Sequence, residues 1–141
     1  MSSNYSQPVS VAQEYYNSSD ADTFYFTIWG GEDIHIGLYE SEDEPIRDAS
    51  RRTVERMART LSSITKETRA IDLGAGFGGS ARYLAETYGC RVVALNLSEV
   101  ENQRDRAMNQ ERGLDGLIDV VDGDFEQLPY DADTFDVVWS Q

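Results

Sequence analysis

The 141-residue sequence predicts a doubly wound α/β fold with a parallel sheet, and three observations lead to this prediction. Short apolar segments alternate with amphipathic segments over most of the chain. The first apolar segment, residues 70–73, runs directly into four glycines within six residues. A run that favours helix, residues 80–85, follows these glycines. A strand, a glycine-rich turn and a helix in this order open the ligand site of a Rossmann-like fold.

The spacing of the glycines fits two ligand motifs. Gly74, Gly76 and Gly79 match the G-x-G-x-x-G pattern of dinucleotide sites, whereas Gly74, Gly76 and Gly78 match the G-x-G-x-G of enzymes that use S-adenosylmethionine (SAM). Asp72 favours SAM, because a carboxylate beside the ligand attracts ammonium and sulfonium groups and repels a pyrophosphate. A glycine-rich turn without a ligand is the structural alternative.

Acidic residues outnumber basic ones by 26 to 12, which gives a formal net charge of −14. Such a surface repels nucleic acids and anionic membranes, so neither is an expected partner. Lys66 is the only lysine, a bias that a high-salt cytoplasm favours, although an ordinary acidic protein fits equally well. Cys90 is the only cysteine, which excludes an intrachain disulfide and a cysteine-based zinc site, and no metal ligands are predicted. Without a signal peptide or a membrane-length apolar run, we expect a cytoplasmic protein.

We expect residues 1–45 to form an aromatic-rich cap segment. The first ten or so residues are polar and predicted to fray. Residues 11–39 predict a short helix and then a loop over the ligand site, because glycines interrupt the segment. Most of its aromatic rings are expected to pack on the domain. The residues that are candidates to line a pocket are Trp29, His35 and Tyr39.

Residues 46–141 are predicted to form the N-terminal part of the ligand-binding domain. Apolar residues at near-helical spacing predict an amphipathic helix over residues 46–64. Its solvent face would carry the arginines Arg47, Arg51, Arg52, Arg56 and Arg59. Further helices are expected over residues 79–88, and from the N-cap Ser98 to about Arg112. The remaining strands are predicted at residues 91–97, 117–121 and 135–139, the last one after a polar turn at 131–134.

The predicted strands stop at four, just where the next loop should begin. An unpaired strand edge is an association hazard. We therefore expect the chain to be the first part of a longer enzyme or half of a split one, with self-association through its exposed fourth strand.

Polar residues follow three of the predicted strands, whose carboxyl ends meet at one edge of a parallel sheet. The first strand supplies Asp72. The second ends near Asn96, where an acidic residue usually binds ribose hydroxyls. The third leads to Asp124, which can accept from an adenine amino group, and to Phe125, which can pack on the ring.

Four segments carry a resemblance to a known family: AIDLGAGFGGSARYLA, ALNLSEVENQRDRA, GDFEQLPYDADTFDVVWSQ and FYFTIWGGEDIHIGLY. They resemble class I SAM-dependent methyltransferases, and most closely the sarcosine/dimethylglycine N-methyltransferases of glycine betaine biosynthesis. Relatives of these enzymes include phosphoethanolamine methyltransferases and cyclopropane fatty acid synthases. The likeness covers roughly residues 12–141, and the segment 29–39 is its most specific part.

The resemblance implies a seven-stranded sheet, of which this chain holds the first four strands. It also implies that Gly74 and Gly76 contact SAM, that Asn96 and Leu97 bind its ribose, and that Asp124 and Phe125 bind its adenine. Gln141 would contact the methionine end of SAM, and Ile36 and Gly37 would close over that methionine portion. Glu101 stands where relatives often have Gln, which puts that contact in question.

The implied reaction is attack of a neutral small amine on the sulfonium methyl, with His35 or Tyr39 as the candidate base. Aromatic rings would hold the quaternary ammonium product. Three alternatives remain open at this point. The acceptor can be another small amine or a lipid-type molecule, the enzyme can be an NAD-linked oxidoreductase, or the chain can be a SAM-binding fragment that is inactive without its C-terminal part.

Overall fold

Four parallel strands form the centre of the molecule, which a computed structural model describes over residues 5–141. The strands are β1 (Arg69–Leu73), β2 (Arg91–Asn96), β3 (Ile118–Asp122) and β4 (Val137–Ser140), in the order β3-β2-β1-β4. The chain builds outward from β1 to β3 and then crosses back to place β4 on the other side of β1. This reversal between β1 and β4 is the switch point at which open α/β sheets bind ligands. The predicted fold class is confirmed.

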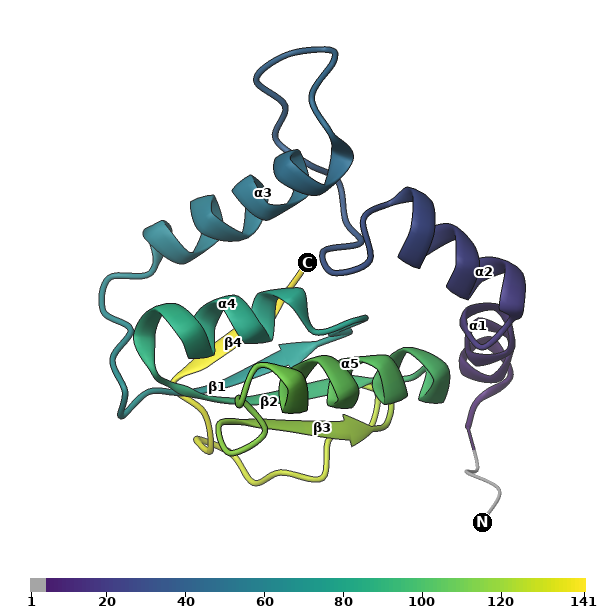
Figure 1. Ribbon diagram of the computed structural model, residues 1–141. Coiled ribbons are helices and arrows are strands. Elements are labelled where there is room, and N and C mark those ends of the chain that lie inside the picture. The colour runs from purple at the N-terminus through teal and green to yellow at the C-terminus, as the bar shows by residue number, and fades with distance from the viewer. Residues whose placement is uncertain (1–4) are drawn as a thin grey trace.

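Helices α4 (Gly79–Tyr88) and α5 (Glu99–Glu111) lie over one face of the sheet, and α3 (Ile46–Thr60) packs against α4 (Figure 1). The predicted N-cap of α5 is confirmed, because Ser98 Oγ accepts from the Glu101 backbone N–H at 3.2 Å. The strands and helices after residue 45 match their predicted positions with small shifts. The two largest shifts are in α3, which ends four residues before its predicted end, and in β4, which begins at Val137. Phe135, the predicted start of that strand, packs edge-to-face on Tyr130 instead.

The N-terminal segment contains more helix than the sequence predicted. It forms α1 (Gln7–Tyr16), α2 (Ser19–Thr23) and a π-helical turn, η1 (Phe24–Ile28). The prediction of fraying up to about residue 10 is wrong for residues 7–10, where Pro8 in the first turn favours helix. Residues 5–6 precede the helix, and residues 1–4 lie outside the described range. Figure 1 shows α1 and α2 beyond the carboxyl ends of the strands, where they can cover a ligand site.

Glu32 fastens this segment to three helical regions at once. Its Oε1 lies 2.9 Å from Arg82 Nε on α4, 3.3 Å from Arg51 NH2 on α3 and 2.9 Å from Arg112 NH1 after α5. Burial acts to raise the pKa of Glu32, but the hydrogen bonds and charges of the three arginines outweigh it and hold the pKa below its ordinary value. The loop that continues into Asp33 and His35 is therefore held firmly against the domain.

Arg82 is fully buried on α4 among apolar neighbours, although its side chain is charged. Besides Glu32, its guanidinium donates to Asp105 Oδ1 at 2.7 Å, to Asn109 Oδ1 at 3.0 Å and to the carbonyl of Phe77 in the glycine turn. A buried guanidinium is tolerated only when its donors are paired in this way. Around it, the hydrophobic core is formed by α3, α4 and the sheet, with Val54, Leu84, Val92, Ile118 and Trp139.

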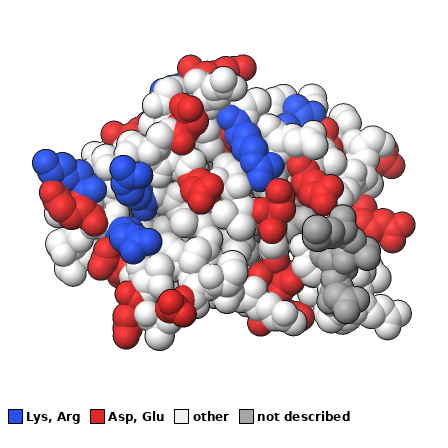
Figure 2. Space-filling view, turned by 90° about the horizontal axis from the view of Figure 1, so that it is seen from below, with Lys and Arg blue, Asp and Glu red and all other residues white. Residues whose placement is uncertain are grey.

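The arginines of α3 do not all lie in solvent as predicted. Arg51 keeps only 25% of its side chain exposed, because it pairs with Asp33 as well as Glu32. Arg52 pairs with Glu40 and Glu44 and donates to the Leu38 carbonyl at 2.6 Å. A planar guanidinium suits carboxylates that approach side by side, so these two residues bind the loop before α3. Elsewhere the surface is dominated by acids, and Figure 2 shows them spread over one face with a few basic side chains among them.

Candidate functional site

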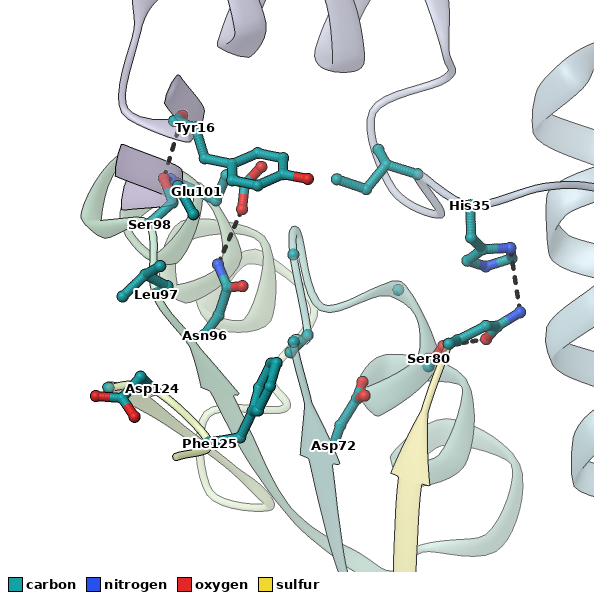
Figure 3. Close-up of a pocket in the computed structure, with 18 of the residues that line it drawn as sticks. Tyr16, His35, Asp72, Ser80, Asn96, Leu97, Ser98, Glu101, Asp124 and Phe125 are labelled. Carbon is teal, nitrogen blue, oxygen red and sulfur yellow. Dashed lines mark hydrogen bonds between the residues drawn. The ribbon is translucent and has the colours of Figure 1, made fainter. Parts of the chain in front are cut away.

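A cavity of about 460 Å³ opens at the carboxyl ends of β1 and β2. Figure 3 shows side chains that converge on it from the strands, from the loop after β3 and from the N-terminal segment. Of the residues that the sequence nominated for the site, the structure brings together Asp72, Gly74, Gly76, Asn96, Leu97, Asp124, Phe125, Gln141 and His35. They lie where the topology predicts a ligand.

Two glycines show why the turn after β1 has its composition. Gly74 has φ +77° and open space beside it, so its backbone conformation favours glycine while leaving room for a ligand. Gly79 is required by crowding: a Cβ there would lie 2.0 Å from Asp33 Oδ1 and 2.6 Å from the Glu32 carbonyl oxygen. The glycine turn and the N-terminal loop thus fit against each other and form adjoining walls of the cavity.

Asp72 is the most perturbed acid in the cavity wall. It is 3% exposed, and burial raises its pKa to about 7, with the carboxylates of Asp105 and Asp33 acting in the same direction. Arg82 pairs with Asp105 and Arg51 with Asp33, and no ion pair joins Asp72 to a cation among residues 5–141. A cationic ligand in the cavity would supply such a partner.

Asn96 and Glu101 form one polar unit at the end of β2. Asn96 Nδ2 donates to Glu101 Oε2 at 2.9 Å, and both residues are buried and line the cavity. Burial raises the pKa of Glu101, while the hydrogen bond from Asn96 opposes that rise. The acidic acceptor that the sequence lacked at Asn96 is therefore supplied five residues later, from the first turn of α5. Two hydroxyl groups of a ligand could be bound here.

Asp124 and Phe125 lie on the loop after β3, on the same side of the cavity as Leu97 (Figure 3). Asp124 Oδ1 accepts from the backbone N–H groups of Glu126 at 2.7 Å and Gln127 at 3.1 Å, so one of its oxygens holds the loop itself. Phe125 is 64% exposed, which leaves its ring available to a flat ligand.

On the other side of the cavity, His35 meets Gln141. Gln141 Nε2 lies 3.1 Å from His35 Nδ1, and Gln141 Oε1 lies 3.1 Å from Ser80 Oγ. Burial lowers the pKa of His35, and the positive charge of Arg51 lowers it further. The contact with the Ile36 carbonyl acts in the opposite direction and raises the pKa. Burial raises the pKa of Asp33 to about 6 despite its 2.9 Å ion pair with Arg51.

Four nominated residues do not reach the cavity. Ile36 is 84% and Tyr39 50% exposed, and both lie outside its lining. Gly37 packs on α3, where a Cβ would lie 2.5 Å from Ala49 Cβ. Trp29 Nε1 donates to the His35 carbonyl at 3.1 Å and supports the loop from behind. After His35 the chain turns away from the cavity, because the Leu38 N–H donates to the Ala49 carbonyl. Cofactor contacts for Ile36 and Gly37 and catalysis by Tyr39 therefore stay predictions, which the shape of this cavity does not favour.

Several residues of the N-terminal segment line the cavity although the sequence did not nominate them. On α1 these residues are Pro8, Val9, Ala12 and Tyr16, and in the loop after η1 they are Glu32, Asp33 and Ile34. The spacing of residues 9, 12 and 16 is that of one helix face, a signal present in the sequence. No comparable signal marks Asp33, because its position depends on the distant Arg51.

Comparison with known proteins agrees with this geometry. The sequence profile of a methyltransferase domain family matches residues 71–141, half of the chain. The chain belongs to this family. The matched region begins within β1 and contains the glycine turn, Asn96, Asp124 and Gln141. It therefore includes every cavity residue that comes from the sheet edge and its loops after Ala70.

Curated relatives extend the likeness to the N-terminal segment. A sarcosine/dimethylglycine N-methyltransferase of Halorhodospira halochloris is 62% identical over 96% of this chain and 48% of its own length. A glycine/sarcosine/dimethylglycine N-methyltransferase of Actinopolyspora halophila is 61% identical over 97% of this chain and 24% of its own. The chain thus spans half or less of the length of the curated relatives it matches.

Solved structures share the fold. A provisionally named sarcosine dimethylglycine methyltransferase from Galdieria sulphuraria superposes with a TM-score of 0.80 at 40% identity, over 86% of this chain and 48% of that one. The cyclase SpnF reaches a TM-score of 0.84 at 23% identity, over 93% of this chain and 48% of its own, which is a likeness of fold alone.

Over residues 5–141, the helices are all too short or too polar to cross a lipid bilayer.

Proposed function

We propose that residues 1–141 bind SAM in this cavity and form the cofactor-binding half of an N-methyltransferase that methylates sarcosine and/or dimethylglycine towards glycine betaine. The observation that carries the proposal is Asp72, a buried carboxylate without a cationic partner among residues 5–141, next to a glycine turn at the switch point of the sheet. A ligand with an ammonium and a sulfonium group matches that environment, whereas a pyrophosphate would be repelled by it.

The cavity residues fit the other parts of SAM. Asn96 and Glu101 offer oxygen acceptors for the two ribose hydroxyls. Phe125 offers an aromatic face for adenine, beside Asp124. Gln141, which the family resemblance nominated for the methionine end, has its Nε2 3.1 Å from His35 Nδ1. Figure 3 shows His35 at the opposite side of the cavity from Asp124.

When bound, SAM supplies a methyl group on positively charged sulfur. The chain's own contribution is to position the ligand and to keep water away from it, which is the main requirement of such a transfer. Tyr16 and the other α1 residues cover the cavity from outside, and Ile34 gives it an apolar wall. An acceptor amine must arrive neutral, so conditions that deprotonate it favour the reaction.

Sarcosine and dimethylglycine are favoured as acceptors because relatives that are 55–62% identical carry those names. A third one, from Aphanothece halophytica, is a sarcosine/dimethylglycine N-methyltransferase 55% identical over 92% of this chain and 47% of its own length. Relatives with lipid-type names, a tocopherol O-methyltransferase and sterol C-methyltransferases, are only 33–34% identical. The alternative of a lipid-type acceptor is weaker for that reason.

A chimera tests the proposal. Residues 1–141 would replace the matched half of the Halorhodospira halochloris relative, and methyl transfer from labelled SAM to sarcosine, dimethylglycine and a tocopherol would be measured. We expect transfer to sarcosine or dimethylglycine and none after Asp72→Asn. A folded chimera that binds SAM but methylates neither amine would refute the proposed acceptors.

A further inference from the structure

The hydrogen-bonding groups around Gln141 fix the orientation of its side-chain amide. Trp139 Nε1 lies 3.3 Å from Gln141 Oε1, and an indole N–H can only donate. Ser80 Oγ donates to the same oxygen at 3.1 Å. The carbonyl oxygen of the amide therefore faces Trp139 and Ser80, and its NH₂ group faces His35.

This orientation determines which nitrogen of His35 carries the proton. Gln141 Nε2 donates to His35 Nδ1 at 3.1 Å, so Nδ1 must be unprotonated. The Ile36 carbonyl, 3.3 Å from Nδ1, would favour a proton there, but two N–H groups would then oppose each other across the Gln141 contact. An imidazole whose Nδ1 is unprotonated is neutral and carries its single proton on Nε2, and the burial that lowers the pKa of His35 acts in the same direction.

Nε2 in turn faces the carboxylate of Asp33. The two atoms, His35 Nε2 and Asp33 Oδ1, lie 4.0 Å apart, too far for a hydrogen bond. Both atoms are buried, and both lack a hydrogen-bond partner among the described residues. Asp33 cannot swing closer, because its Oδ2 is held by Arg51 Nε at 2.9 Å. Both residues line the cavity, so its wall holds a buried donor and a buried acceptor that no described residue satisfies.

We propose that His35 is a hydrogen-bond donor and not a base: Gln141 holds it as the neutral Nε2–H tautomer, and its N–H acts together with the acceptor Asp33 Oδ1. The pair fits a ligand end that carries both an acceptor and a donor, such as the carboxylate and ammonium of an amino acid. The methionine part of SAM and the acceptor sarcosine both have this chemistry, and in this respect the inference rests on the proposed function. The tautomer itself does not.

The tautomer can be observed directly, because His35 is the only histidine of the chain. A long-range nitrogen–proton NMR spectrum of the nitrogen-labelled 141-residue chain distinguishes Nδ1–H from Nε2–H. We expect Nε2–H in the wild type. Gln141→Glu places an acceptor opposite Nδ1, so it should move the proton to Nδ1 and raise the pKa of the ring.

Ser80→Ala is the matched control for that experiment. It removes one donor to Gln141 Oε1 but leaves Trp139 to orient the amide, so the tautomer should stay Nε2–H. A wild-type Nδ1–H tautomer, or a Gln141→Glu variant with the same tautomer as the wild type, would overturn the assignment of His35.

Titration with S-adenosylhomocysteine and with sarcosine then identifies the source of the ligand end. We expect one of them to shift the Nε2–H signal without changing the tautomer, and Asp33→Asn to weaken that ligand about tenfold. If calorimetry shows that S-adenosylhomocysteine binds and neither ligand shifts the signal, the donor–acceptor pair is refuted while the proposed function stands. If S-adenosylhomocysteine fails to bind to a chain with the Nε2–H tautomer, the proposed function fails while the tautomer stands.

Discussion

The folded chain and its proposed ligand favour different protonation states of Asp72. A carboxylate in this position is stable when neutral, because it is buried and its nearest charged neighbours include Asp105 and Asp33. The proposed cationic ligand needs the ionised form. The same feature therefore determines how both stability and affinity should depend on pH.

Asp72→Asn should stabilise the ligand-free chain at pH 8. The folded-state pKa of about 7 lies above the ordinary 3.8, so the stability that Asp72 contributes is complete below about pH 4 and is lost as the pH rises through 7. At about 1.4 kcal/mol per pKa unit, the gain for asparagine at pH 8 is of the order of 2–4 kcal/mol. Urea unfolding at pH 8 and pH 4 measures it, and an equal effect at the two pH values would contradict the explanation.

SAM affinity should fall as the medium becomes more acidic than pH 7. Below its pKa, Asp72 must lose a proton before it can pair with a cation, so the dissociation constant should rise about tenfold per pH unit. Calorimetry in buffers of different ionisation enthalpy should detect release of a proton at pH 6 and little release at pH 8.5. An affinity that does not vary between these values would exclude the ionisation of Asp72 from binding.

Some of these residues could be recognised from the sequence and others could not. Asp72 and Asn96 lie near the carboxyl ends of apolar strands and Asp124 lies two residues beyond one, so their place at the sheet edge follows from strand topology. Asp33 lies in a loop and depends on Arg51, a residue of α3 that the amphipathic pattern had assigned to solvent. Local pattern cannot reveal a pairing between distant parts of the chain.

At the level of elements, the N-terminal segment is joined to the domain mainly by charge. Glu32 contacts arginines from α3, from α4 and from beyond α5, and the cavity residues Asp33 and His35 follow it immediately. The helices and strands after residue 45 were predictable from periodicity and caps. In the N-terminal segment one short helix was predicted, which α1 supplies, but α2 and η1 were expected to be loop because of the glycine and aromatic content.

Glu32→Gln should loosen this segment. Loss of the charge leaves three arginines with a weaker partner, and we expect the free energy of unfolding to fall by about 2 kcal/mol. Glu86→Gln is the matched control, because Glu86 contacts only Arg112 of the three, at 3.4 Å and on the surface, and should change stability by less than about 0.5 kcal/mol. Hydrogen exchange of residues 31–36 should rise in the first variant alone, and equal exchange in the two variants would show that Glu32 does not hold the loop.

For the whole molecule, β4 is the feature with the clearest consequence. It pairs with β1 on one side only, and Val138 is 68% exposed. An unpaired strand edge with an exposed apolar residue favours pairing with another strand. We therefore expect the 141-residue chain to associate through β4 and to lack methyl transfer by itself, as the relatives' greater length also suggests.

Sedimentation velocity tests the role of this edge. The wild-type chain should sediment faster as its concentration rises, and Val138→Lys should shift it towards the monomer with little change in melting temperature. A wild-type chain that stays monomeric at all concentrations, or a monomer that turns over sarcosine, would show that the edge does not need a partner.

The central claim is that this cavity selects SAM through the unpaired charge of Asp72. Isothermal titration calorimetry of the 141-residue chain at pH 8, with SAM, S-adenosylhomocysteine and NAD, tests it most directly. We predict binding of SAM and S-adenosylhomocysteine but not of NAD, and a loss of at least about tenfold in SAM affinity for Asp72→Asn, the scale of one charge-assisted contact. Heat with NAD and none with SAM, or unchanged SAM affinity in the variant, would contradict the claim.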